Sequence, residues 1–279
     1  MKSSSRNSFL VILVLLAITL VLYFSWESEE VPLDGSLTKS NIEEIDENSL
    51  EEVEFVAFDL PSNIGNQIVS RPFYTLSYNN KHEQADWVAY TLYPLDDSLR
   101  VKRRDNFRID PLVEDGSATL KDYKGSGYDR GHLAPSKAMS YSKEAMNASF
   151  FMSNMSPQLP GFNRGIWKKL EAQVLDWSKE SDSLYVVTGP VFNKPLGTIG
   201  ENKVTIPRSY YKTIIRFKGD KMSGLAFLLD NKKSSASYFD FATSIDSIEK
   251  VTGIDFYHKM KPELQEKLEA NKELLKFIN

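Results

Sequence analysis

The chain has 279 residues, 41% of them hydrophobic and 12% aromatic, which is enough to bury a sizeable core in one large domain or two small ones. It contains no cysteine, and this excludes a disulfide framework, a thiolate zinc site and a cysteine nucleophile. Residues 1–56 hold three basic and eleven acidic side chains, a net charge of −8, so residues 57–279 carry +4 within the overall −4. This later part is mildly basic, which suits a polyanionic partner and also suits plain solubility.

Residues 1–26 have the pattern of an export segment. An apolar run of sixteen residues, Phe9–Phe24, follows Lys2 and Arg6 and precedes acidic residues. The run is at the short end for a bilayer span, and the positive charges before it place the N-terminus in the cytoplasm. We expect an N-terminal transmembrane helix that anchors a periplasmic or extracellular domain. The alternative is a cleaved secretory signal, for which the following YFSWESEE offers no convincing cleavage site.

Residues 27–54 are acidic, poor in aromatic residues and free of hydrophobic periodicity. A segment of this composition cannot bury enough apolar surface to form a core, so it predicts a solvated tether. The folded domain is expected over residues 55–279.

Several stretches rich in β-branched and aromatic residues predict strands. A polar connector between the first two suggests a hairpin, and His82 within it is interpreted as a surface histidine. The third strand is expected to end at Gly189-Pro190. The predicted strands are Gln67–Tyr78, Asp86–Leu92, Leu184–Thr188, Lys203–Phe217 and Met222–Leu229.

Helical patterns occupy the end of the chain, at Ser244–Thr252 and Pro262–Phe277. Pro262 suits the first turn of a helix, and the leucines that follow suggest an amphipathic face, with Leu275 among them. Strands followed by helices, without regular βαβ alternation, predict an α+β fold with a mainly antiparallel central sheet flanked by helices.

Five basic side chains cluster within Leu99–Arg108 (LRVKRRDNFR). Such a cluster can bind phosphates, and it can equally be the solvated face of a loop. Arg104 is the preferred candidate for contact with a substrate, and Arg103 and Arg108 compete with it.

The stretch Tyr128–Ser136 (YDRGHLAPS) combines a histidine with a neighbouring guanidinium. An unperturbed imidazole titrates near neutrality, so His132 is a candidate to take a proton from water at physiological pH. Arg130 offers a planar, permanently charged fork that matches phosphate oxygens. A lone histidine is more often structural than catalytic, but the glycine-rich approach KGSGYDRGH favours a built site.

A helical pattern begins near Asn163, which could simply be the helix N-cap. Asn163, Trp167 and Glu171 are spaced by four and four, so they would follow one side of an α-helix. An amide oxygen and a carboxylate placed in this way could serve one hard cation such as Mg²⁺. Glu171 could instead be an exposed residue paired with the nearby Lys168.

Three segments together resemble the DNA/RNA non-specific endonuclease family, the DRGH group of ββα-metal nucleases of the Serratia nuclease and endonuclease G type. They are YDRGHLAPS at 128–136, SNMSPQ at 153–158 and NRGIWKKLE at 163–171, and their order and spacing match the family pattern. The similarity extends to VTGPVF, VTIPRSYYK and SIEKVTGIDF, so it covers roughly residues 65–260.

The resemblance implies a metal-dependent, sugar-non-specific endonuclease with a ββα-metal core that hydrolyses DNA and RNA and leaves 5′-phosphate ends. One Mg²⁺, with Mn²⁺ as the alternative ion, would stabilise the phosphorane and the leaving 3′-oxygen. The implied roles are His132 as general base, Arg130 beside the scissile phosphate, Asn163 as metal ligand, Glu171 on the metal's water shell, Asn154 as auxiliary support and Arg104 on the substrate.

Two other hypotheses remain at this point. The first is a catalytically silent protein of the same fold that binds or takes up nucleic acid, against which every matching catalytic position is filled. The second is a hydrolase of another phosphodiester, such as the headgroup of a lipid in the membrane that holds the anchor. No oligomeric state is predicted.

Overall fold

The computed structural model describes residues 60–62 and 65–278. The predicted anchor, the predicted tether and the expected domain start at Phe55 lie outside these residues. Within them, no helix is long and apolar enough to cross a membrane. The run Phe9–Phe24 lies outside the described residues, so the anchor stays a prediction.

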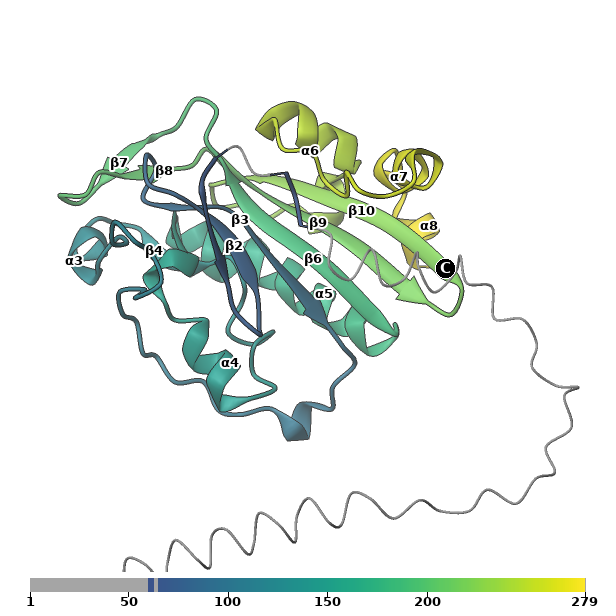
Figure 1. Cartoon of the computed structure of the whole chain (residues 1–279), viewed down its shortest axis with the longest axis horizontal. Helices are drawn as coiled ribbons and strands as arrows, with labels where there is room; N and C mark the ends of the chain where they lie inside the picture. Colours follow the sequence, from purple (N-terminus) through teal and green to yellow (C-terminus); the bar gives the residue numbers. More distant parts are fainter. Residues whose placement is uncertain (1–59, 63–64, 279) are drawn as a thin grey trace, which may run out of the picture. The chain divides into compact units, whose positions relative to one another are not determined.

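A seven-stranded antiparallel sheet forms the centre of the described fold, in the order β1-β2-β3-β6-β9-β10-β11 (Figure 1). The predicted α+β class with a mainly antiparallel sheet is therefore confirmed. The strands are β1 (Gln67–Ser70), β2 (Thr75–Asn79), β3 (Gln84–Leu92), β6 (Ser183–Val191), β9 (Ser209–Lys218), β10 (Lys221–Asp230) and β11 (Ala242–Thr243).

Two small antiparallel pairs lie outside the central sheet: β4 (Asp129–His132) with β5 (Met155–Gln158), and β7 (Gly197–Ile199) with β8 (Val204–Ile206). Helices connect the strands and close the chain. They are η1 (Asp97–Leu99), α3 (Leu120–Tyr123), α4 (Lys143–Ala148), η2 (Met152–Asn154), η3 (Phe162–Trp167), α5 (Lys168–Lys179), η4 (Tyr238–Phe241), α6 (Ile245–Thr252), α7 (Pro262–Glu269) and α8 (Leu274–Ile278).

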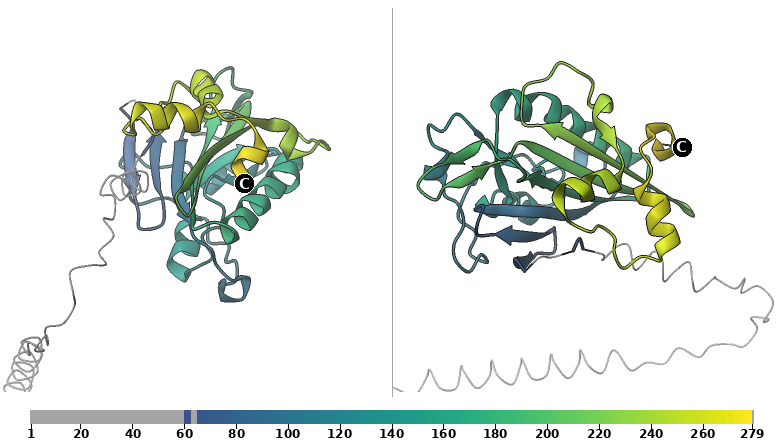
Figure 2. Two further views of the ribbon diagram at one scale, coloured as in Figure 1. Left: turned by 90° about the vertical axis from the view of Figure 1, so that its right-hand side faces the viewer. Right: turned by 90° about the horizontal axis from the view of Figure 1, so that it is seen from above.

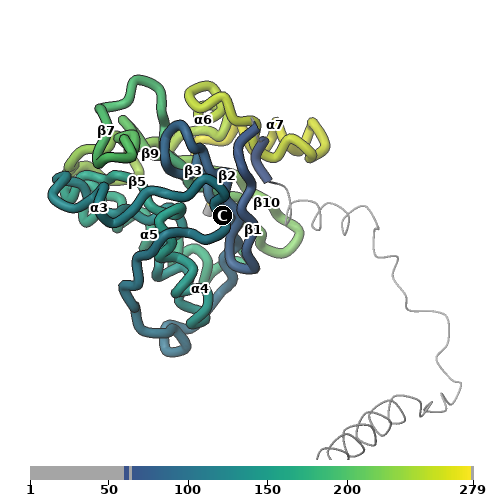
Figure 3. The backbone as a smooth tube through the Cα atoms, turned by 60° about the vertical axis from the view of Figure 1, so that its left-hand side comes forward, coloured from purple at the N-terminus to yellow at the C-terminus, as the bar shows by residue number. Residues whose placement is uncertain are grey.

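Alternation along the central strands divides the core into two layers. Val186 and Ile214 belong to the cluster that includes α5, whereas the next residues, Val187 and Ile215, belong to the cluster with α6 and α7. Successive side chains of a strand point to opposite faces, so the sheet is covered by helices on both sides (Figure 2). Helices α4 and α5 lie on the side away from α6 and α7 (Figure 3).

Two predicted strands are each interrupted at a proline. Gln67–Tyr78 forms β1 and β2, which pair with each other across a turn that contains Pro72. Lys203–Phe217 forms β8 and β9, separated at Pro207. Proline has no N–H to donate and fixes its own φ, so a chain turns there more readily than it continues a ladder. The prediction of continuous strands was wrong at both places.

Strand β6 continues through Gly189-Pro190, where it was predicted to end. Pairing with β3 stops at Thr188, while pairing with β9 continues to Val191. The side of the strand toward β3 is therefore unpaired at Pro190, and the missing N–H of this proline costs no hydrogen bond there. A side chain at Gly189 would place its Cβ 2.2 Å from the backbone oxygen of Asp86. Glycine permits this close approach and lets the strand run on.

The C-terminal helix predictions were half right. The pattern at Ser244–Thr252 forms α6, and Ser244 caps this helix as a hydroxyl acceptor for the N–H of Ser247. Pro262–Phe277 forms two helices instead of one, because the Asn271 side chain bonds the backbone N–H of Glu273 and the chain turns. Leu275 is consequently exposed and does not join the predicted apolar face.

Candidate active site

The site is built on two strands and the helix that follows them. Strand β4 carries the sequence DRGH and pairs antiparallel with β5, so that Gly131 lies opposite Ser156. A Cβ at Gly131 would lie 2.2 Å from Cδ of Gln158, so any other residue there would displace the buried Gln158 side chain. After β5 the chain passes through η3 into α5. This strand–strand–helix unit brings together the segments at 128–136 and 163–171.

A cavity of about 470 Å³ opens beside this unit. Five of its lining residues are cationic and three are carboxylates, so its lining is net positive and suits an anionic ligand. The lining residues are Arg103, Asp105, Phe107, Asp129, Arg130, His132, Pro135, Ser136, Lys137, Asn163, Arg164, Lys168, Glu171, Ala172 and Leu175.

His132 is buried at the inner wall of this cavity. Its ring meets Phe150 edge to face at 4.9 Å between centroids, and Phe107 lies at 5.9 Å on another side. Burial, together with the positive charges of Arg103 and Arg130, lowers the pKa of His132 to about 3. The imidazole is therefore neutral at physiological pH, and its Nε2 has no hydrogen-bond partner among the described residues. The expected titration near neutrality is therefore wrong: the ring is a weaker base than a free imidazole, and its neutral form can accept a proton.

Arg130 lies next to His132 with its guanidinium stacked 4.0 Å from the ring centroid of Phe107. It forms no ion pair or hydrogen bond with any described residue. Stacking fixes the plane of the guanidinium and leaves its N–H groups available to a phosphate in the cavity.

Asn163 is held by a contact that the sequence analysis did not anticipate. Its Nδ2 donates to Oδ2 of Asp129 at 3.0 Å. The same carboxylate accepts two hydrogen bonds from Arg164, at 2.8 and 2.6 Å. Partial burial raises the pKa of Asp129, but these hydrogen bonds outweigh it and hold the pKa below its usual range. The only advance signal was that Asp129 belongs to the DRGH motif.

The helix that carries Asn163 is not the regular one that was predicted. Asn163 lies inside the π-helical turn η3, whose N-cap is Gly161, and Gly165 departs from helical geometry with φ −102° and ψ −114°. The N-cap interpretation of Asn163 and the continuous one-sided spacing were therefore wrong. The wide turn nevertheless leaves both Asn163 and Glu171 on the cavity. π-turns inside helices are frequent at functional sites.

Glu171 lies in the first turn of α5, half-buried, with its side chain on the cavity. Burial raises the pKa of its carboxyl group, and the positive charges of Lys212 and Arg103 counteract that rise. No ion pair with Lys168 is formed among the described residues, so Glu171 is not the exposed ion-pairing residue of the alternative interpretation.

Lys212 is a second residue that sequence reasoning missed. It is fully buried on β9, its Nζ donates to Oγ1 of Thr188 at 2.5 Å, and it lies 5.1 Å from the ring centroid of Trp167. Lys212 forms no ion pair within 4.0 Å with a described residue. Its positive charge nevertheless acts on the Glu171 carboxyl group through the low-polarity interior. The signal was a lysine in line with the inward-facing residues Tyr210 and Ile214.

Asn154 does not reach the cavity. It is completely buried, its Oδ1 accepts from the N–H of Ala134, and its Nδ2 donates to the carbonyl groups of Ala134 and Ser149. The backbone N–H of Leu133 also donates to the carbonyl of Asn154. These contacts hold the residues after His132 in place, so Asn154 has the geometry of a supporting residue.

Of the arginines in the basic cluster, Arg103 lines the cavity and Arg104 does not. Both side chains are exposed, but Arg103 donates to Oγ of Ser136 at 2.9 Å and to Asp105, whereas Arg104 forms no hydrogen bond or ion pair with a described residue. Arg108 is occupied by backbone carbonyl groups and by the ring of Phe151. His82 lies elsewhere, half-buried and stacked on Phe192.

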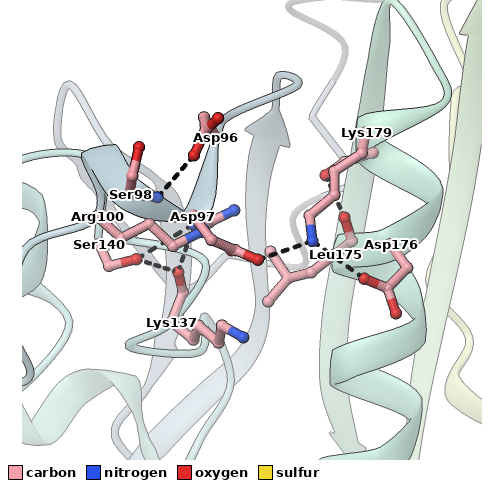
Figure 4. A network of polar contacts seen from close by, with 10 residues as sticks. Asp96, Asp97, Ser98, Arg100, Lys137, Ser140, Leu175, Asp176 and Lys179 are labelled. Atoms are coloured by element: carbon pink, nitrogen blue, oxygen red, sulfur yellow. Dashed lines mark hydrogen bonds and ion pairs between the residues drawn. The ribbon is translucent and has the colours of Figure 1, made fainter.

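A polar network joins the loop before the basic cluster to the end of α5 (Figure 4). Asp97 accepts from Nε of Arg100 at 2.8 Å and from Nζ of Lys179 at 3.0 Å. Arg100 also donates to the backbone carbonyl of Lys137 at 3.0 Å. Lys137 lines the cavity, and Lys179 lies one helical turn after Leu175, which lines it too, so this network joins the segment at Lys137 to the helix that forms another part of the wall.

An imidazole, an amide and a carboxylate, carried by two strands and a helix, lie around a net-positive cavity that suits an anionic ligand. A sequence profile for DNA/RNA non-specific endonucleases matches residues 52–263. The chain therefore belongs to the DNA/RNA non-specific endonuclease family. The resemblance seen in the sequence is confirmed, including its extent over nearly the whole domain.

Individual relatives agree with this assignment. The chain is 34% identical over 220 residues to a nuclease of Nostoc sp., covering 74% of this chain and 78% of the relative. It is 32% identical over 207 residues to human mitochondrial endonuclease G (68% and 69%) and 30% identical over 237 residues to a nuclease of Serratia marcescens (80% and 87%). A chain of the crystallised EndoG/EndoGI complex superimposes with a TM-score of 0.69 at 27% identity, covering 77% of this chain and 93% of that one.

Proposed function

We propose that this member of the family is a metal-dependent, sugar-non-specific endonuclease that hydrolyses DNA and RNA at the cavity beside β4 and leaves 5′-phosphate ends. The observation that carries the proposal is that His132 and Asn163 line one basic cavity together with Glu171 and with Arg130, which has no ion-pair partner among the described residues.

The donors at the cavity fit a hard divalent cation. Nδ2 of Asn163 donates to Asp129, Oδ1 of the same amide accepts no hydrogen bond from a described residue, and Glu171 supplies a carboxylate on the same cavity. Mg²⁺ takes oxygen ligands and keeps several waters, and Mn²⁺ accepts the same donors. Asn163 would hold the ion directly and Glu171 would hold its water. When bound, such an ion supplies stabilisation of the charge on the phosphorane and the leaving 3′-oxygen.

The protein side chains do the rest of the work in this proposal. The neutral His132 accepts the proton of the attacking water, which general-base catalysis requires. Arg130 and Arg103 hold the phosphate with charge-assisted hydrogen bonds, and Arg103 takes the place that the sequence analysis gave to Arg104. Contacts of this kind go to the backbone and carry no base sequence, which accounts for activity on both polymers.

The substrate class is tested with the full-length chain on supercoiled DNA, a folded RNA and phospholipid vesicles, each with Mg²⁺ and with EDTA. We expect both nucleic acids, and no phospholipid, to be cleaved only with the metal. End analysis of the fragments should find 5′-phosphate groups. Binding of nucleic acid without any cleavage would favour the catalytically silent protein of the same fold, and release of lipid headgroups would favour the hydrolase of a lipid phosphodiester.

We also propose that residues 1–26 anchor the enzyme in the membrane with the domain in the periplasm or outside the cell. The support is the apolar run Phe9–Phe24 with positive charges before it and negative charges after it. In fractionated cells, the full-length chain should sediment with membranes and be digested by protease added from outside. Recovery in the cytosolic fraction would refute the topology.

A further inference from the structure

One carboxylate connects two consecutive residues of the π-helical turn. Asp129 accepts from Nε and Nη2 of Arg164 through both of its oxygens, and it accepts from Nδ2 of Asn163 as well. Neighbouring residues on a regular α-helix point about 100° apart and do not face each other. The departure from helical geometry at Gly165 accompanies the arrangement that lets Asn163 and Arg164 reach the same group.

This contact determines which end of the Asn163 amide faces the cavity. An ionised carboxylate only accepts hydrogen bonds, so it selects the NH₂ end of an amide and repels the oxygen. With Nδ2 held at 3.0 Å by Asp129, Oδ1 is left for another partner. The bidentate pair with Arg164 holds the carboxylate, through both of its oxygens, in the position from which it accepts from Nδ2 of Asn163.

We propose that Arg164 is a positioning residue for the metal ligand: it clamps Asp129, and Asp129 orients the Asn163 amide so that its oxygen is presented to the cation. The inference rests on the proposed function, in which Asn163 holds the metal. A different role is also open to Arg164, because its side chain is 73% exposed and lines the same cavity, where it could bind a substrate phosphate. The two roles predict different measurements.

In the test, the full-length chain is titrated with Mn²⁺ in the absence of substrate, and electron paramagnetic resonance measures how much Mn²⁺ is bound. Arg164→Gln should weaken Mn²⁺ binding about tenfold, the low end of the effect of removing a partner behind a metal ligand. Arg164→Lys should be intermediate, because an ammonium keeps the charge but cannot chelate both oxygens. The matched control is Lys169→Gln, which removes one positive charge from an exposed position five residues away that does not line the cavity.

A second measurement separates the two roles. With EDTA present, a short DNA duplex should bind Arg164→Gln and Lys169→Gln equally well. Unchanged Mn²⁺ affinity in Arg164→Gln, with weaker DNA binding than in the control, would overturn the inference and assign Arg164 to the phosphate. Asn163→Ala completes the set: if it binds Mn²⁺ as tightly as the wild type, the proposed metal site is itself wrong. If it binds weakly while Arg164→Gln matches the wild type, only the positioning role fails.

Discussion

The His132→Ala variant of the full-length chain is expected to lose about a thousandfold in kcat on a defined DNA duplex, within the range typical for removal of a general base. The reason is that His132 is the one histidine on the cavity, held neutral by burial and by Arg103 and Arg130. Its KM should change little, because the neutral ring adds no charge to the phosphate contacts. Steady-state kinetics on the duplex would measure both constants.

The matched control for this prediction is His258→Ala, since His258 is exposed and lies outside the cavity. It should retain wild-type kcat. Both variants should keep the thermal unfolding midpoint of the wild type to within a few degrees, because the loss of kcat in His132→Ala is attributed to the missing proton acceptor and not to unfolding. A His132→Ala enzyme with wild-type kcat would show that another group takes the proton from water.

Asn163→Ala should produce the second large effect, on the metal. Removing a direct ligand is expected to weaken the apparent affinity for Mg²⁺ by more than about a hundredfold, beyond the effect of residues that only support a ligand. Cleavage at low Mg²⁺ should then be almost lost and should recover in part at high Mg²⁺. A titration of cleavage rate against Mg²⁺ concentration measures this.

Asn106→Ala serves as the control, because Asn106 is an exposed asparagine near the cavity that does not line it. Its Mg²⁺ dependence should match the wild type. If Asn163→Ala instead keeps the wild-type midpoint for Mg²⁺ and loses only its maximal rate, Asn163 does not bind the ion and acts on the substrate.

Motif spacing correctly predicted which segments form the site, because the DRGH strand and the helix that starts near Asn163 each contain their polar groups within a few residues. It did not reveal how the side chains are held. The contact between Asp129 and Asn163 joins residues 34 positions apart, and it depends on a π-turn that helical periodicity treats as regular helix. Lys212 shows the same difficulty, since the charge that influences Glu171 comes from a distant strand of the central sheet.

The strand patterns correctly predicted the class of fold. They did not predict where the individual strands and helices end. Prolines explain most of the errors: Pro72 and Pro207 interrupt predicted strands, but Pro190 lies within one. The difference is pairing, because a proline is tolerated where one side of the strand has no partner. Arg103 and Arg104 are adjacent in an irregular segment, so no periodicity could indicate which one faces the cavity.

The central claim is that one cavity joins a histidine base to a metal-dependent reaction on nucleic acid. Nicking of supercoiled plasmid tests it most directly, with wild-type and His132→Ala chains compared in Mg²⁺ and in EDTA. The account predicts nicked and then degraded plasmid only for the wild type with Mg²⁺. Cleavage by the wild type in EDTA, or equal cleavage by His132→Ala in Mg²⁺, would contradict it.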